Sequence, residues 1–149
     1  MADGGRMMTE MNDLSGVERT LPVERSFTKP FWDATREKRL LMQYDRVAGA
    51  YQFYPRATSI FTGKASNLEW REVSGKGSIY TFTIARRGRP PFREHEPYWL
   101  AMVRLDEDVA IMANVVNCST GQMATGLRVR PVWAPLSDGR NLLMFEPNV

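Results

Sequence analysis

Two side chains of this sequence could carry nucleophilic chemistry. Cys118 is the single cysteine and His95 the single histidine among 149 residues. A thiol nucleophile needs a base beside it, and the base needs a further group to orient it. Cys118 follows an apolar segment and His95 lies among charged residues, so neither has an orienting group nearby in the sequence. We therefore predict no catalytic residue in this chain.

Anion binding is the second kind of chemistry that the sequence offers. The segment 85–98, ARRGRPPFREHEPY, carries Arg86, Arg87, Arg89 and Arg93 between two predicted strands. Guanidinium groups bind phosphates and carboxylates well, and two prolines limit the entropy lost on ordering. This segment could hold the phosphates of a ligand such as a coenzyme A thioester or contact an acidic patch on a partner. It could equally be an exposed loop that its own glutamates balance.

A third pattern has the spacing of a metal site without the ligands. Asp45 and Ala48 are three residues apart, and so are Ser59 and Thr62, as in the two facing Cys-x-x-Cys knuckles of a rubredoxin-like zinc ribbon. Ala48 cannot bind a metal and neutral hydroxyls are poor zinc ligands, so we expect no zinc. Either an apolar cluster holds the hairpin instead, or it stays partly mobile until a partner covers it. The candidate cluster is Tyr44, Tyr51, Phe53, Tyr54, Ile60 and Phe61.

The order of segments around this hairpin carries a family resemblance. The segments are PFWDATREKRLLMQ, YQFYPR after Gly49, LEWREVSGKGSIYTFT, PYWLAMVRLDED and a closing LMFEP. From about Phe27 to Pro147 the chain resembles the acyl-CoA-associated OB-fold family, a domain of unknown function with an N-terminal rubredoxin-like zinc ribbon. All four zinc cysteines are replaced here.

The resemblance implies a function as well as a fold. Such proteins typically lack a catalytic centre and act as partner subunits of thiolase-like enzymes or acyl-CoA hydratases, in lipid or aromatic compound metabolism. We expect an accessory subunit of a hetero-oligomer that helps bind or channel an acyl-CoA substrate and is not catalytic alone. A coenzyme A thioester would be the substrate of the complex, and no cofactor is bound. The candidate contact residues for acyl-CoA or the partner are Phe31, Trp32, Tyr51, Phe53, Arg56, Arg86, Arg87, Arg89 and Arg93.

Composition excludes several other classes. With 43% hydrophobic and 25% charged residues the chain is of the ordinary globular type, and no apolar run is long enough to span a bilayer. The N-terminal residues lack the apolar core of a signal peptide, so we expect a cytoplasmic location. A formal charge of +3 is too small to indicate that the chain binds a polyanion.

Three regions are expected along the chain. Residues 1–26 contain no clear periodicity and are predicted to be a flexible arm. Residues 27–65 are predicted to form a helix, from an N-cap at Thr28 to about Leu40, followed by the degenerate ribbon. Phe31 and Trp32 could pack on the domain's own core or anchor another subunit.

Residues 66–149 are predicted to form an OB-fold barrel, so the fold class is mainly β. The expected strands are 68–73, 78–85, 98–105, 109–117, 127–134 and 141–145, with turn residues between them. Gly75 and Gly77 would allow a bend or bulge in the first of these strands. The alternative function is a single-stranded nucleic-acid-binding OB-fold module. Tyr80 and Phe82 would then form a stacking platform, although the core is their commoner place.

Overall fold

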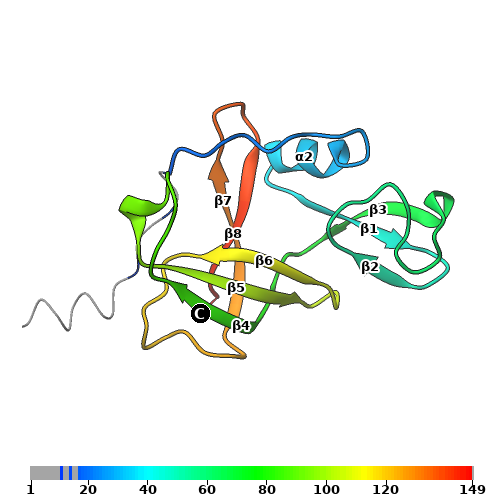
Figure 1. Cartoon of the computed structure of the whole chain (residues 1–149). Coiled ribbons are helices and arrows are strands. Elements are labelled where there is room, and N and C mark those ends of the chain that lie inside the picture. The colour runs from blue at the N-terminus through cyan, green and yellow to red at the C-terminus, as the bar shows by residue number, and fades with distance from the viewer. Residues whose placement is uncertain (1–10, 12–13, 15–16, 149) are drawn as a thin grey trace, which may run out of the picture.

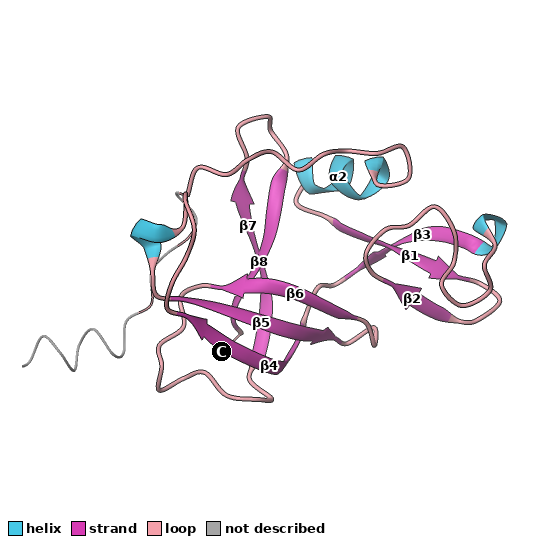
Figure 2. Cartoon of the chain, in the orientation of Figure 1, coloured by secondary structure: helices cyan, strands magenta, loops and turns pink. Residues whose placement is uncertain are grey.

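The computed structural model describes residues 11, 14 and 17–148, which form a three-stranded sheet and a closed barrel, with one α-helix that contacts a strand of each (Figure 1). The predicted fold class, a mainly β chain with an OB-fold barrel after an N-terminal helix and a ribbon, is confirmed. Figure 2 shows how little helix lies beside the strands. Among the described residues, no helix is long and apolar enough to cross a membrane.

The helix α2 spans Lys29–Arg36 and has Pro30 in its first turn. Thr28 is the N-cap residue as expected, but its hydroxyl donates to the Arg25 carbonyl and does not cap the helix. The helix ends four residues before the expected Leu40. Lys38 has a φ of 57°, a left-handed conformation that terminates helices.

The ribbon sheet has the strand order β2-β1-β3, with β1 at Leu40–Asp45, β2 at Ala50–Gln52 and β3 at Leu68–Val73. All pairs are antiparallel, and β3 pairs with β1 along its whole length. The segment 68–73 was expected as the first barrel strand and instead completes the ribbon. An isolated two-stranded hairpin is marginally stable, so the third strand gives this small sheet the support that it needs.

The barrel contains five strands in the closed order β4-β5-β6-β8-β7. Their bounds are Gly77–Ala85 for β4, Tyr98–Leu105 for β5, Ala110–Val115 for β6, Arg128–Pro135 for β7 and Asn141–Pro147 for β8. Alternate residues of β5 point inward, and the side chains of Trp99, Ala101, Val103 and Leu105 are all buried. These strands agree with the expected ones to within a few residues.

Two aromatic residues of β4 do not lie where they were expected. Tyr80 is 58% exposed and Phe82 is 37% exposed, although the core was their expected place. The strand has a bulge between Ile79 and Thr81, which shifts the register of its side chains. The buried aromatic residue here is Trp99, which Phe82 contacts edge-on at 5.7 Å between ring centroids.

The described part of the N-terminal region is packed against the barrel. Leu14 and Val17 are buried in a cluster that includes Ala134 and Met144. Further along, the Arg140 guanidinium donates a hydrogen bond of 2.9 Å to the Pro22 carbonyl. The prediction of a flexible arm is therefore wrong for these residues, because apolar side chains fix them to the barrel. For residues 1–10, 12–13 and 15–16 it lies outside the described residues.

The connection between the two sheets is short and tightly packed. Gly75 has a φ of 75°, and a Cβ atom there would lie 2.4 Å from Cγ of Pro131. At Gly77 a Cβ atom would lie 2.4 Å from the Arg104 carbonyl oxygen. Both positions therefore require glycine, for a close approach to the barrel and not for binding phosphate. The predicted domain boundary at residue 66 falls before β3, whereas the change from ribbon to barrel occurs at residues 74–76.

Candidate functional site

A buried carboxylate lies where the metal of a zinc ribbon would be. Asp45 ends β1 and is fully buried. Its Oδ1 accepts hydrogen bonds of 2.8 Å from the backbone N–H groups of Val47 and Ala48. Its Oδ2 accepts hydrogen bonds from the hydroxyls of Ser59, at 2.5 Å, and Thr62, at 2.7 Å. One carboxylate thus joins both knuckles of the ribbon.

These four hydrogen bonds determine the charge state of Asp45. Burial by itself raises the pKa of a carboxyl group, but the donors from Ser59, Ala48, Thr62 and Val47 favour the ionised form. Together they lower the pKa of Asp45 to about 2. Asp45 is therefore ionised at neutral pH.

The second knuckle is ordered by the same set of groups. The Ser59 hydroxyl, which donates to Asp45, also accepts hydrogen bonds from the backbone N–H groups of Phe61 and Thr62. The Thr62 hydroxyl accepts a hydrogen bond from the Asn67 side chain at 3.0 Å. Each hydroxyl is thus both a donor and an acceptor, as a buried hydroxyl should be.

Two buried glutamines extend the polar interior of the ribbon. The Gln52 amide donates to Oε1 of Gln43 at 2.7 Å, and Oε1 of Gln52 accepts from the Ile60 backbone N–H at 2.8 Å. The Gln43 side chain exchanges two hydrogen bonds of 2.8 Å with the backbone of Arg56. The loop between β2 and β3 is therefore fastened to both strands of the hairpin.

This set of donors and acceptors does not fit a structural zinc ion. Ala48 supplies no ligand atom, and both oxygens of Asp45 are already hydrogen-bonded to the protein. Over the described part of the chain, no group of three or more histidine, cysteine or acidic side chains gathers in one place. A zinc ion would have to displace the hydrogen bonds that hold the two knuckles together.

The expected apolar cluster does not replace the metal. Tyr54, Ile60 and Phe61, which we call the exposed ribbon residues, are 57%, 56% and 47% exposed. The Tyr44 and Tyr51 rings do contact each other, at 4.8 Å between centroids. The expectation of an aromatic core in the ribbon is wrong for the exposed ribbon residues, because the polar groups around Asp45 occupy the interior.

Several predicted contact residues instead pack within the chain. Phe31 is buried in the main core and contacts the ring of Trp32 at 5.0 Å and that of Phe53 at 5.9 Å. Trp32 also lies against the Arg140 guanidinium at 5.0 Å. Tyr51 and Phe53 are half-buried against the same core. Of the two uses considered for Phe31, packing on its own core is the observed one.

The four arginines of segment 85–98 lie far from the ribbon. Arg86, Arg87, Arg89 and Arg93 are exposed, and none forms an ion pair with a described residue. Figure 1 places their loop, between β4 and β5, at the opposite end of the barrel from the ribbon. The exposed Arg56 is on the ribbon itself. The candidate contact residues of the ribbon and those of the arginine loop therefore lie on two separate surfaces.

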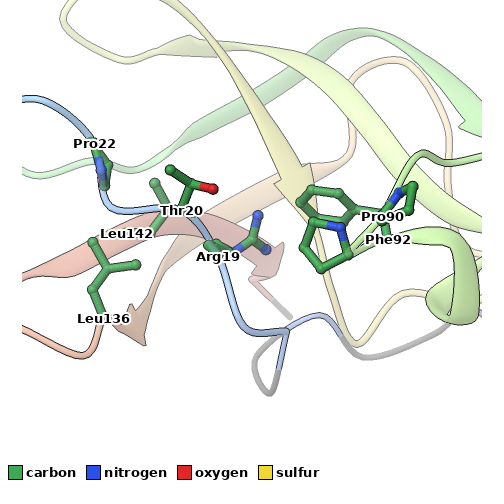
Figure 3. Close-up of a pocket in the computed structure, with 8 residues that line it drawn as sticks. Arg19, Thr20, Pro22, Pro90, Phe92, Leu136 and Leu142 are labelled. Atoms are coloured by element: carbon green, nitrogen blue, oxygen red, sulfur yellow. The ribbon is translucent and has the colours of Figure 1, made fainter.

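Next to the arginine loop is a hollow of about 400 Å³ (Figure 3). Three parts of the chain line it: the N-terminal segment with Arg19, the loop with Phe92, and the β7–β8 hairpin with Leu136 of its turn and Leu142 of β8. No sequence pattern indicated this hollow, because its walls come from segments more than 40 residues apart. Arg19 is the one charged residue in its lining among the residues described.

The structure provides no support for catalysis by Cys118 and His95. Cys118 is buried, burial raises the pKa of its thiol, and its Sγ points to the Ser119 carbonyl at 3.6 Å. A thiol with a raised pKa is a poor nucleophile at neutral pH. His95 lies in the short turn Arg93–His95, and no described hydrogen bond joins it to Cys118.

Comparison with known proteins identifies the family. A family model described as "ChsH2, C-terminal OB-fold domain" matches residues 70–134. A "DUF35 domain-containing scaffold protein" of Pyrococcus furiosus is 30% identical over 102 residues, which cover 68% of this chain and 74% of that protein. The chain therefore belongs to the DUF35 family of acyl-CoA-associated OB-fold proteins, and the family predicted from the sequence is confirmed.

A longer relative and a solved structure of lower sequence identity are also similar to this chain. The "3-oxo-4,17-pregnadiene-20-carboxyl-CoA hydratase alpha subunit" of Mycobacterium tuberculosis is 24% identical over 137 residues, or 92% of this chain and 43% of that protein. The chain thus spans less than half the length of that subunit. A solved structure described as "Ltp2-ChsH2(DUF35) aldolase" has a TM-score of 0.75 at 22% identity, covering 87% of this chain and 100% of that one. At that identity the likeness establishes the shared fold.

Proposed function

We propose that this chain is an accessory subunit that docks on a thiolase-like or hydratase-like enzyme and helps bind or channel its acyl-CoA substrate. Relatives named as a hydratase alpha subunit, a scaffold protein and part of an aldolase complex support this proposal. The coenzyme A thioester is the substrate of the complex, and this chain contributes a binding surface but no catalytic group or zinc ion.

The observation that carries the proposal is the exposure of Tyr54, Ile60 and Phe61 on a rigid frame. Exposed apolar side chains that lie together tend to mark surfaces for partners, and Ile60 and Phe61 are neighbours in the chain. Here hydrogen bonds from the backbone N–H groups of Ile60 to Gln52 and of Phe61 to Ser59 fix the backbone that carries these two side chains. A surface ordered in advance loses little entropy on binding. The ribbon is thus built to present these side chains and not to bury them.

Affinity purification from the native cells at moderate salt, with mass spectrometry of bound proteins, tests this proposal. We expect a thiolase-like or hydratase-like polypeptide near one-to-one, whose acyl-CoA turnover is then assayed with and without this chain. The double variant Ile60→Ser/Phe61→Ser should lower partner recovery at least about tenfold, because central apolar residues dominate interface energies. Met112→Ser is the matched control, since Met112 is 53% exposed but lies on the barrel.

The arginine loop is proposed as a second contact. Changing Arg86, Arg87 and Arg89 together to alanine should weaken partner binding, chiefly at low salt, because exposed charges act mainly by steering association. Partner recovery that is unchanged in both the double and the triple variant would contradict the proposed docking surfaces. Recovery of this chain alone would contradict the subunit function itself.

The alternative of a nucleic-acid-binding module rests on one observation. Tyr80 is exposed and the Arg104 guanidinium lies 5.0 Å from its ring centroid, which offers a surface on which a base could stack. Recovery of single-stranded nucleic acid with a steep dependence on salt, lost in Tyr80→Ala, would favour this function over the subunit.

A further inference from the structure

The hollow beside the arginine loop contains a cation that none of the described carboxylates neutralises. The Arg19 guanidinium is half-buried and lies 4.8 Å from the ring centroid of Phe92. Its hydrogen bond to the Leu14 carbonyl is long, at 3.4 Å, and no described carboxylate forms an ion pair with it. Burial lowers the pKa of Arg19, which still leaves it protonated at neutral pH. A cation removed from water in this way favours an anion beside it.

The rest of the lining determines which kind of anion fits. Pro22, Pro90 and Pro91 have no backbone N–H to donate, and the side chains of Phe92 and Leu142 are apolar. Thr20 adds one hydroxyl. A phosphate group, with three oxygens and up to two charges, would find too few donors here. A carboxylate has one charge and two oxygens, which match one guanidinium fork.

The position and size of the hollow also suit a ligand. OB folds commonly bind ligands beside the loops that follow their first and fourth strands. In this barrel those loops are residues 86–97 and 136–140. Each loop contributes one wall of the hollow, the first through Phe92 and the second through Leu136. A volume of about 400 Å³ falls in the range of small-molecule sites. Figure 3 shows Arg19 between the loop side, with Phe92 and Pro90, and the β7–β8 side, with Leu142.

We propose that this hollow binds a small monocarboxylate with an apolar body, whose carboxylate pairs with Arg19 and whose body lies against Phe92, Leu136 and Leu142. The inference does not rest on the accessory-subunit function. It assigns a ligand site to the end of the barrel opposite the ribbon, so either proposal can fail without the other.

A titration of the full chain by ¹⁵N–¹H NMR, with sodium octanoate as the probe, tests the proposal. We expect saturable shifts that centre on residues 19, 20, 92 and 142, with a Kd of about 1 mM or lower. 1-Octanol and inorganic phosphate are the comparison probes. 1-Octanol has the apolar body without the charge, and phosphate has the charge without the apolar body. Both should bind at least about tenfold more weakly than octanoate.

Two variants assign the binding to the hollow. Arg19→Met keeps most of the side-chain length but removes the charge, and should weaken octanoate about tenfold or more without altering the affinity for 1-octanol. Arg25→Met is the matched control, because Arg25 is exposed on the same segment outside the hollow. If Arg19→Met does not fold, Leu136→Trp, which fills the hollow and keeps the cation, should abolish the shifts.

Three results would overturn the proposal. One is the absence of saturable octanoate binding. Another is octanoate binding that Arg19→Met, or Leu136→Trp in its place, leaves unchanged. The third is that phosphate or 1-octanol binds at the same residues with an affinity equal to that of octanoate.

Discussion

Around the turns of the ribbon the buried side chains are polar, whereas inside the barrel they are apolar. Of the seven polar residues found buried in the described part of the chain, four lie in the ribbon: Gln43, Asp45, Gln52 and Ser59. The barrel interior contains Trp99, Val103, Phe145 and other apolar side chains. A ribbon of three short strands has too little volume for its own apolar core, so a fully satisfied polar network takes that place.

The two regions also share one apolar layer. Leu40 and Met42 of β1 and Val73 of β3 belong to the same buried cluster as the barrel interior. The face of the ribbon sheet that carries these residues is thus held by hydrophobic burial, and only the two knuckles depend on Asp45. The comparison predicts that changes in the barrel affect the whole molecule, while changes at Asp45 act locally.

The largest effect is expected from Phe145→Ala. Phe145 is fully buried and lies on β8, where it pairs in register with Val115 of β6 and Pro131 of β7. Removing its ring should lower the free energy of unfolding by about 3–5 kcal/mol, because a cavity forms where the strands meet. Urea unfolding followed by far-UV circular dichroism measures the change, and Phe145→Leu should cost less. A loss below about 1 kcal/mol for the alanine variant would show that the barrel does not depend on this residue.

Asp45→Asn should act on the ribbon alone. An asparagine has one acceptor oxygen where the aspartate uses two, and its NH₂ group would face donors that need an acceptor. We expect amide hydrogen exchange in residues 42–62 to become about tenfold faster or more, with the barrel strands unchanged. Asp33→Asn, on the exposed face of α2, is the matched control. Equal protection in both variants would mean that the Asp45 carboxylate does not hold the knuckles.

Acid should open the ribbon before the barrel. The pKa of Asp45 is about 2 in the folded chain, which is lower than the ordinary value of 3.8. The folded state therefore gains stability from this group above about pH 4 and loses it as the pH falls toward 2. Hydrogen exchange at pH 5, 4 and 3 should show the loss in residues 42–62 first, and Asp45→Asn should remove this pH dependence. Simultaneous acid opening of ribbon and barrel would contradict the separation of the two.

The smallest effect is expected from Met112→Ser on the barrel surface. Met112 is 53% exposed on β6, so its truncation removes little buried area. The free energy of unfolding should change by no more than about 0.5 kcal/mol in urea. A loss above about 1 kcal/mol would indicate that this surface is part of the barrel's packing.

The sequence predicted the barrel well because its signals are local. Strands β5 and β8 begin where expected, since alternating apolar residues and nearby turn residues define each strand by itself. The predicted place of β3 in the barrel was wrong because its paired residues in β1 lie 23 or more residues away, and spacing along the chain cannot reveal a pairing in space.

The arrangement around Asp45 was predicted only in part. The spacing of Asp45, Ser59 and Thr62 identified the knuckles and the poor fit to zinc, but it was the aromatic residues that were expected to hold them. An aspartate two and three residues before free N–H groups is a typical turn cap, and this signal could have pointed to Asp45. The hollow around Arg19 had no such signal, because it exists only once three distant segments have packed.

The close contact between Gly75 and Pro131 has a consequence for assembly. The link between β3 and β4 is short, and Gly75 lies directly against Pro131. The ribbon therefore lacks the rotational freedom relative to the barrel that a flexible linker would allow. The exposed ribbon residues therefore have a fixed position relative to the barrel. A protein that contacts both the ribbon and the barrel must match this arrangement, so the length of the link between β3 and β4 is itself a determinant of which partners fit.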